Sequence, residues 1–243
     1  DIIDQALSTI KEIAIEECDK VPYATPLWYA KKRQLMGDDK VGDGMLDRFV
    51  FAEIERLQQD DDGRVPHPYK PSLFEFSFGA VKGPDDDPHS LHKPVDLIDI
   101  QKDWNQSDGD QIGKKSSDIV RFIGKIDRID CTPDGLFGII DYKTGKKIPG
   151  PSDLTRMTAL QLPLYLLAYH KISHLTPAFG SYVQLQRKIM HSLILYDPAH
   201  KSTLPKGKLP KSEPKWRDIL ECALDSSISH VHTIRDGQFP IQA

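Results

Sequence analysis

The sequence lacks the features that define several protein classes. It contains only three cysteines in 243 residues, they are scattered, and no two of them form a C-x-x-C pair. This usage excludes a disulfide scaffold and a self-contained metal–thiolate site, and it predicts a reducing compartment, the cytoplasm. The longest apolar stretch, Ala159–Tyr169, is broken by a glutamine and a proline and is far shorter than the ~20 residues that span a bilayer. We therefore expect no membrane partner.

The chain also lacks a basic and apolar leader, and it contains no helicase motifs. Its first residue is Asp1, which predicts a fragment of a longer protein. The 32 Lys and Arg residues nearly balance the 36 Asp and Glu residues, for a net charge of −4. The charge is uneven, because residues 85–110 are acidic and residues 171–217 are basic. The basic stretch is either a surface that binds a polyanion or a solvated loop, and the pattern alone leaves both readings open.

Hydrophobic periodicity predicts a mixed α/β (α+β) fold with a small central sheet flanked by helices, and with extra helices at the N-terminus. The predicted helices are Ile2–Asp19, Leu27–Leu35, Met45–Gln59, Leu154–Lys171 and Trp216–Thr233. The predicted strands are Leu73–Phe78, Val95–Ile100, Ile119–Asp130, Leu136–Lys143 and Phe179–Leu185.

Two carboxylates are predicted to face each other across a hairpin. The sequence Thr-Pro-Asp-Gly at positions 132–135 is a strong turn signal between two strand-like runs. A tight turn there pairs positions whose numbers sum to about 268, which sets Asp127 opposite Asp141, with Cβ atoms ~4.5–5.5 Å apart. Two such charges repel unless one is protonated or a cation lies between them. Lys143 supplies one positive charge, and oxygen-only ligands favour Mg²⁺ or Mn²⁺ for the rest. A solvent-exposed hairpin with Asp–Lys pairs is the alternative.

Two helices carry polar residues on apolar faces. Glu53 lies on the apolar stripe of its helix, where a buried acid needs a partner such as a metal ion. Gln161 and Tyr165 are spaced i, i+4 and stand one above the other, with Pro163 expected to kink the turn between them. An edge glutamate and a core tyrosine are the ordinary structural alternatives.

Three motifs in this order resemble those of a known family. They are Gly-x-Ile-Asp-Arg-x-Asp at 124–130, Asp-Tyr-Lys-Thr-Gly-Lys at 141–146 and Gln-Leu-Pro-Leu-Tyr at 161–165. Together they look like the motifs of the PD-(D/E)XK nuclease superfamily, and more narrowly like its RecB/AddB-type exonuclease branch. The strand at 74–79 and the segment at 234–240 are also similar to that branch.

The resemblance implies a restriction-endonuclease-like core that hydrolyses DNA phosphodiester bonds with Mg²⁺ or Mn²⁺. It implies metal ligation by Asp127, Asp141 and the Tyr142 carbonyl, with Lys143 acting on the attacking water and the phosphate. Glu53 is our choice for the family's first acidic position, as a catalytic residue and metal ligand. The implied DNA contacts are Gln161, Tyr165, Lys146 and Arg128.

The resemblance further implies one nuclease domain over residues 1–243. It has a helical N-terminal part (1–60), a catalytic core (70–190) and a C-terminal helix (215–235). We expect it to belong to a helicase–nuclease of recombinational DNA repair. Many relatives hold an iron–sulfur cluster through cysteines that follow a Gly-x-Phe-Pro segment like 237–240. Such a cluster is expected here only if those cysteines exist beyond Ala243. The alternatives are a stand-alone nuclease of the CRISPR-adaptation type and a catalytically silent DNA-binding or scaffold domain.

Overall fold

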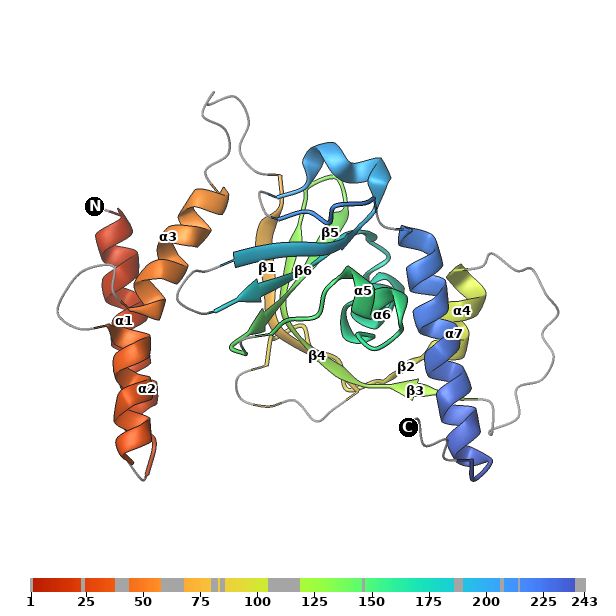
Figure 1. Cartoon of the computed structure of the whole chain (residues 1–243), viewed down its shortest axis with the longest axis horizontal. Coiled ribbons are helices and arrows are strands. Elements are labelled where there is room, and N and C mark those ends of the chain that lie inside the picture. The colour runs from red at the N-terminus through yellow and green to blue at the C-terminus, as the bar shows by residue number, and fades with distance from the viewer. Residues whose placement is uncertain are drawn as a thin grey trace.

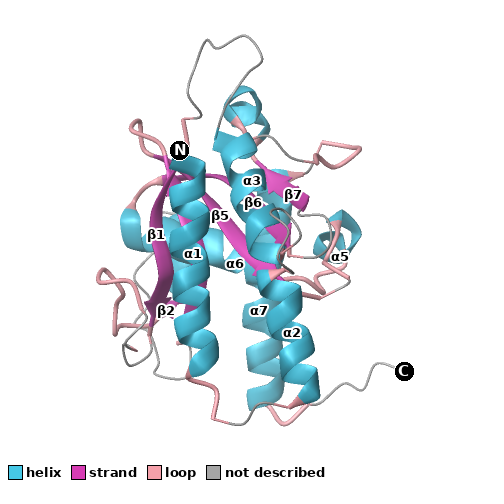
Figure 2. Cartoon of the chain, turned by 90° about the vertical axis from the view of Figure 1, so that its left-hand side faces the viewer, coloured by secondary structure: helices cyan, strands magenta, loops and turns pink. Residues whose placement is uncertain are grey.

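The computed structural model describes residues 2–22, 25–37, 44–57, 68–79, 83, 86–104, 119–145, 147–185, 190–205, 208–213 and 215–238. Three N-terminal helices, α1 (Ile2–Asp19), α2 (Pro26–Met36) and α3 (Met45–Leu57), gather at one end of a central sheet. At the other end α4 (Leu97–Trp104) runs beside α7 (Trp216–Arg235), so the sheet lies between two helical ends (Figure 1). Figure 2, which faces the N-terminal helices, shows the three grouped in front of the sheet.

The sheet has five strands in the order β1-β4-β5-β6-β7. The strands are β1 (Lys70–Phe78), β4 (Gly124–Cys131), β5 (Leu136–Lys143), β6 (Thr176–Gln184) and β7 (Met190–Tyr196). Only β5 and β6 are parallel, and the other neighbours are antiparallel. Two helices, α5 (Pro151–Thr155) and α6 (Gln161–Ser173), connect the parallel pair, because a parallel crossover needs a long connection. A separate pair joins β2 (Val95–Asp96) to β3 (Arg121–Phe122), and a 3₁₀ helix, η2, spans Pro198–Thr203.

The predicted hairpin is confirmed. The turn at Gly135 has φ +88°, which favours glycine, and Thr132 Oγ1 accepts the Leu136 N–H at 2.9 Å. The ladder pairs Arg128 with Ile140 and Cys131 with Phe137. These pairs have the predicted sum of 268, so the register inferred from the turn is correct.

Apolar side chains from alternate positions fill both faces of the sheet, as strand periodicity requires. On one face Ile129 and Ile139 join the buried side of α6 and the inner side of α7. On the other face Ile140 and Phe179 pack with the fully buried Tyr69. Helices α1 and α3 are joined by an ion pair from the partly exposed Lys11 Nζ to the buried Asp47 Oδ1 at 2.6 Å.

The structure differs from the expected elements in four places. The single strand expected over Ile119–Asp130 is interrupted at Ile123, which separates β3 from β4. The strand expected at Val95–Ile100 stops after Asp96, because the Asp96 carboxylate accepts the Ile98 N–H at 3.1 Å and caps helix α4. The single helix expected over Leu154–Lys171 is two helices, separated where Met157 takes a left-handed backbone with φ 55°. Strand β7 was not predicted, although the run Leu193–Tyr196 is entirely apolar.

Pro163 does not kink its helix. Helix α6 begins at Gln161, so Pro163 lies in the first turn, where its missing N–H has no helical partner to lose. None of the helices in the described part of the chain combines the length and the apolar character needed to cross a bilayer.

Gly138 is expected to be irreplaceable in β5. A Cβ atom at this position would overlap the ring of Phe179, the residue paired with Gly138 on the neighbouring strand β6. We expect Gly138→Ala to lower the free energy of unfolding by about 1–3 kcal/mol, the usual cost of overpacking a core. Thermal denaturation checks this, with Gly83→Ala as the control, since its added Cβ would meet its nearest atom at 3.6 Å. Equal melting temperatures for both variants would contradict the packing.

Candidate active site

The carboxylates of Asp127 and Asp141 lie where the β4–β5 ladder ends. The last pair of the ladder is Arg128 with Ile140, so Asp127 and Asp141 occupy the next opposed positions. Here the strands are joined by a side chain, since the Tyr142 N–H donates to Asp127 Oδ2 at 2.8 Å. The N–H and C=O of one strand residue point to the same side. The Tyr142 carbonyl therefore faces the side of β5 on which Asp127 lies.

Lys143 is held between a carboxylate and an amide. Its Nζ atom lies 2.6 Å from Asp141 Oδ2 and donates to Gln161 Oε1 at 3.1 Å. Asp141 and Lys143 are two residues apart on β5 and share one face of the sheet, and Gln161 is the first residue of α6 on that face. The structure thus brings together the predicted residues Asp127, Asp141, Lys143 and Gln161.

Tyr165 lies one turn farther along α6 and reaches the start of β4. Its hydroxyl accepts the Lys125 N–H at 3.4 Å. A Cβ atom on Gly124 would lie 2.6 Å from Tyr165 Cε1 and 2.9 Å from Phe78 Cζ, so only glycine allows the ring to pack there. This explains why a glycine opens the 124–130 motif and places Tyr165 beside the strand that carries Asp127.

Burial raises the pKa of both carboxyl groups above the ordinary value. For Asp127 the hydrogen bond from the Tyr142 N–H acts in the opposite direction. For Asp141 the Lys143 ammonium lowers the pKa and the negative charge of Asp127 raises it. Two neighbouring acids whose pKa values are raised by burial attract a cation, because a positive charge between them relieves both the burial cost and the repulsion.

The donor set fits a hard divalent cation. Asp127, Asp141 and the Tyr142 carbonyl offer only oxygen atoms, as Mg²⁺ and Mn²⁺ prefer. In the described ranges of the chain, no three or more His, Cys, Asp or Glu residues form a group that could hold a metal. Two carboxylates are nevertheless sufficient for Mg²⁺, which commonly takes its remaining ligands from water and substrate phosphate.

Comparison with protein families agrees with this geometry. The profile of the PD-(D/E)XK nuclease superfamily matches residues 4–243, nearly the whole chain. The chain belongs to this superfamily. A comparison with curated protein sequences gave no match. The five-stranded mixed sheet with helices on both sides is the restriction-endonuclease-like fold of PD-(D/E)XK nucleases, so the predicted fold class is confirmed.

Glu53 does not join the PD-(D/E)XK carboxylates. Its Oε2 atom accepts hydrogen bonds from Arg128 Nη1 at 2.7 Å and from Arg56 Nη2 at 3.1 Å. Arg128 alternates with Asp127 along β4 and projects from the opposite face of the sheet. The burial inferred from the apolar stripe is confirmed, since the Glu53 side chain is 12% exposed, but its partners are arginines. Its assignment as a catalytic metal ligand finds no support in this arrangement.

Arg128 was expected to contact DNA, and the structure corrects this. Its side chain is 3% exposed and binds both oxygens of the fully buried Asp130, at 2.6 Å and 2.9 Å. It also donates to the Tyr142 hydroxyl at 3.1 Å. A guanidinium enclosed in this way does not reach a phosphate. Lys146, another expected DNA contact, lies outside the described residues.

The charged cluster on this face, formed by Glu53, Arg56, Arg128, Asp130 and His191, was missed by sequence reasoning. Arg56 joins Glu53 to Asp130 Oδ2 at 3.1 Å, and His191 Nε2 lies 3.3 Å from Glu53 Oε1. The signal was present on β4, where Arg128 and Asp130 occupy consecutive positions of one face inside a buried strand. The cluster ties α3 to β4 and β7, directly behind the PD-(D/E)XK carboxylates.

His191 is expected to make stability depend on pH. Burial lowers its pKa below the ordinary 6.5, and the charge of Glu53 only partly opposes this. As the pH falls below 6.5 the unfolded chain takes up the proton and the folded chain does not, so the folded state loses stability until the pH passes its own lowered pKa. We expect His191→Asn to flatten the pH dependence of the melting temperature between about pH 5 and 7.

The slope that one group contributes is at most about 1.4 kcal/mol per pH unit. The exposed His174 provides the control, since its left-handed backbone with φ 61° accepts asparagine. If the melting temperature of His191→Asn changes with pH as steeply as that of His174→Asn, then His191 takes up its proton equally in the folded and the unfolded chain, and the prediction is wrong.

Proposed function

We propose that this chain is a divalent-metal-dependent DNA exonuclease domain of the RecB/AddB type, which hydrolyses phosphodiester bonds. The observation that supports it best is the convergence of Asp127, Asp141, Lys143 and Gln161 at the open end of the β4–β5 ladder. These residues come from all three motifs. Lys143 contacts both Asp141 and Gln161, and Asp127 accepts the N–H of Tyr142, which lies between Asp141 and Lys143 in the chain. A silent scaffold has no need to hold these charges together at the cost of burying them.

Each residue has a role that follows from its contacts. Asp127, Asp141 and the Tyr142 carbonyl would hold Mg²⁺ or Mn²⁺, and the bound cation would supply charge stabilisation at the scissile phosphate. Lys143 adds a fixed positive charge in the same place, because Asp141 and Gln161 restrict its ammonium. Gln161 and Tyr165 form the wall along which the DNA strand would lie.

The wider setting follows from the motif resemblance. We propose that the domain works with a helicase domain or subunit in recombinational DNA repair, in the cytoplasm. The three cysteines Cys18, Cys131 and Cys222 are free thiols, which supports a reducing compartment. An iron–sulfur cluster is proposed only if cysteines exist beyond Ala243. Phe239 and Pro240, the end of the segment that precedes such cysteines in relatives, lie outside the described residues. A single domain over residues 1–243 also stays a prediction.

Degradation of end-labelled single-stranded DNA with Mg²⁺ or Mn²⁺ tests the proposal. We expect the wild type to shorten the strand, and both Asp141→Asn and Lys143→Ala to reduce the rate by about 10²–10³-fold, the usual loss for a group that stabilises developing charge. Circular single-stranded DNA should resist, because an exonuclease needs an end.

Two exposed positions supply matched controls: Asp134→Asn in the hairpin turn and Lys93→Ala in the loop before β2. Both should cleave like the wild type. Cleavage that survives Asp141→Asn would refute the site, and cleavage of the circle would make the enzyme an endonuclease. DNA binding without any cleavage would favour the scaffold alternative.

The Asp141 carboxylate is also expected to cost stability when no metal is bound. Its raised pKa means that the ionised form is unfavourable in the folded chain, so its stabilising contribution is lost once the pH exceeds the folded pKa. Asp141→Asn removes the charge at constant shape. We expect the metal-free variant at pH 7 to melt about 2–4 °C above the wild type, the shift for about 1 kcal/mol.

Addition of Mg²⁺ should reverse this order. Binding to the folded state raises the melting temperature of the wild type, whereas the variant has lost a ligand and should not respond. An equal response of both proteins in differential scanning calorimetry would place the metal elsewhere.

A further inference from the structure

Helix α2 is well formed but buries none of its side chains. Its start is regular, since Thr25 Oγ1 accepts the Trp28 N–H at 3.2 Å and Pro26 occupies the first turn. Yet Leu27 is 70% exposed and Tyr29 is 62% exposed. Core packing therefore does not account for Leu27 or Tyr29.

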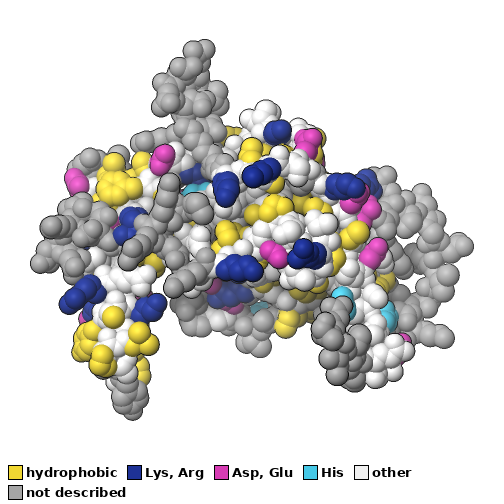
Figure 3. Space-filling view, viewed as in Figure 1, with side chains coloured by type: hydrophobic (Ala, Val, Ile, Leu, Met, Phe, Trp, Pro, Cys, Tyr) yellow, Lys and Arg dark blue, Asp and Glu magenta, His cyan; other side chains and the backbone are white. Residues whose placement is uncertain are grey.

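The charge of α2 has one sign. Its eleven residues include Lys31, Lys32 and Arg33 and no acidic residue, in a chain whose net charge is −4. In the space-filling view Lys and Arg side chains flank the lobe that α2 forms, and hydrophobic side chains cover its lower end (Figure 3). Aromatic and cationic side chains together on one exposed helix complement a polyanion that carries stacking bases.

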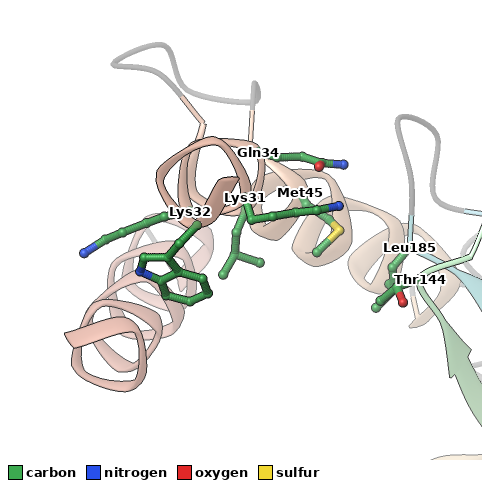
Figure 4. Close-up of a pocket in the computed structure, with 8 residues that line it drawn as sticks. Lys31, Lys32, Gln34, Met45, Thr144 and Leu185 are labelled. Atoms are coloured by element: carbon green, nitrogen blue, oxygen red, sulfur yellow. The ribbon is translucent and has the colours of Figure 1, made fainter. Parts of the chain in front are cut away.

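A groove of about 350 Å³ lies between α2 and the sheet. Trp28, Lys31, Lys32, Gln34, Leu35 and Met45 line one side, and Thr144 and Leu185 line the other. Figure 4 shows Lys31 extending toward Met45, whereas the side chain of Lys32 extends in the opposite direction. Lys32 is instead paired with Asp19 at 3.0 Å. Lys31 is thus the cation that the groove presents.

The far wall of this groove adjoins the catalytic face. Thr144 directly follows Lys143, so their Cα atoms are about 3.8 Å apart. Thr144 and Leu185 directly follow the ends of the two parallel strands β5 and β6, and the carboxyl ends of parallel strands are where α/β sheets bind ligands. A DNA strand bound at Asp141 and Lys143 would therefore have to pass only one residue, Thr144, to enter the groove.

We propose that this groove binds the single-stranded part of the DNA substrate, with a base stacked on Trp28 and a phosphate on Lys31. This inference rests on the proposed nuclease function and adds the path of the strand. Duplex DNA is a poor occupant, because its bases are already stacked and do not reach an aromatic side chain. The groove volume also falls within the range of ordinary ligand sites.

Binding measured without metal separates this proposal from cleavage. Fluorescence anisotropy of a labelled oligothymidylate in EDTA compares the full chain with variants. We expect Trp28→Ala to weaken binding about tenfold, a typical loss for one stacked base, and Trp28→Phe to retain it. Lys31→Glu should weaken binding and lower the slope of log K against log salt by about 0.7, the value for one phosphate on a single strand.

The matched controls are Phe51→Ala, an exposed aromatic residue on α3 outside the groove, and Lys93→Glu, which makes the same charge change on an exposed loop. Both should bind like the wild type. Trp28→Ala that binds no worse than Phe51→Ala overturns the proposal. Photocrosslinking of an oligonucleotide that carries 5-iodouracil should mark Trp28, and crosslinks confined to other segments would also overturn it.

Other outcomes distinguish the remaining occupants. If binding of the protein to anionic phospholipid vesicles depends on Trp28 and Lys31 while binding to the oligonucleotide does not, the helix is a membrane contact and the proposal is wrong. If the wild-type protein cleaves DNA and the groove variants bind and cleave DNA as the wild type does, the groove is not the DNA-binding site, but the proposed nuclease function is supported. If oligonucleotide binding depends on the groove residues but neither the wild type nor any variant cleaves DNA, the groove is a DNA-binding site and the proposed nuclease function is wrong.

Discussion

The pairing of β4 with β5 is the constraint on which the site depends. Its register sets Asp127 opposite Asp141 and stops one residue short of them, so the strand ends open around the buried carboxylate of Asp141 and the partly buried carboxylate of Asp127. The Tyr142 N–H holds this opening at a fixed width by bonding Asp127 instead of a strand partner. Burial raises the pKa of both acids, and the charge of Asp127 raises the pKa of Asp141 further. The ionised carboxylates are therefore unfavourable here without a cation, and a cation bound between them would relieve this cost.

The two faces of the sheet divide the work. The face under α6 carries the groups that can act on a substrate, and Lys143 there is restrained by Gln161. The opposite face carries charges that satisfy one another, with Arg128 shared between Glu53 and Asp130. This separation follows from the geometry of a β-strand, because consecutive side chains of β4 and of β5 point to opposite faces of the sheet. A rigid cluster behind the carboxylates fixes the strands that position them.

The elements of the fold were predictable where local signals were strong. Ile2–Asp19 is a helix as its apolar spacing predicts, and the turn at 132–135 gave the correct hairpin. One error occurred where a tertiary contact decided the outcome. Asp96 caps α4 and bonds the distant Val120 N–H at 3.2 Å, and no periodicity in a six-residue window contains that contact.

The sequence by itself determined the opposed carboxylates, the neighbouring lysine and the i, i+4 pair on α6, because turn chemistry and strand and helix periods are local rules. It also determined that Glu53 is buried. Only the tertiary structure decided which distant partners Glu53 finds, since Arg128 and His191 come from β4 and β7, far away in the chain. The same holds for Arg128, which one motif presents as a free cation and the fold encloses. Periodicity tells which way a side chain points, and only the packing of distant elements tells what it meets there.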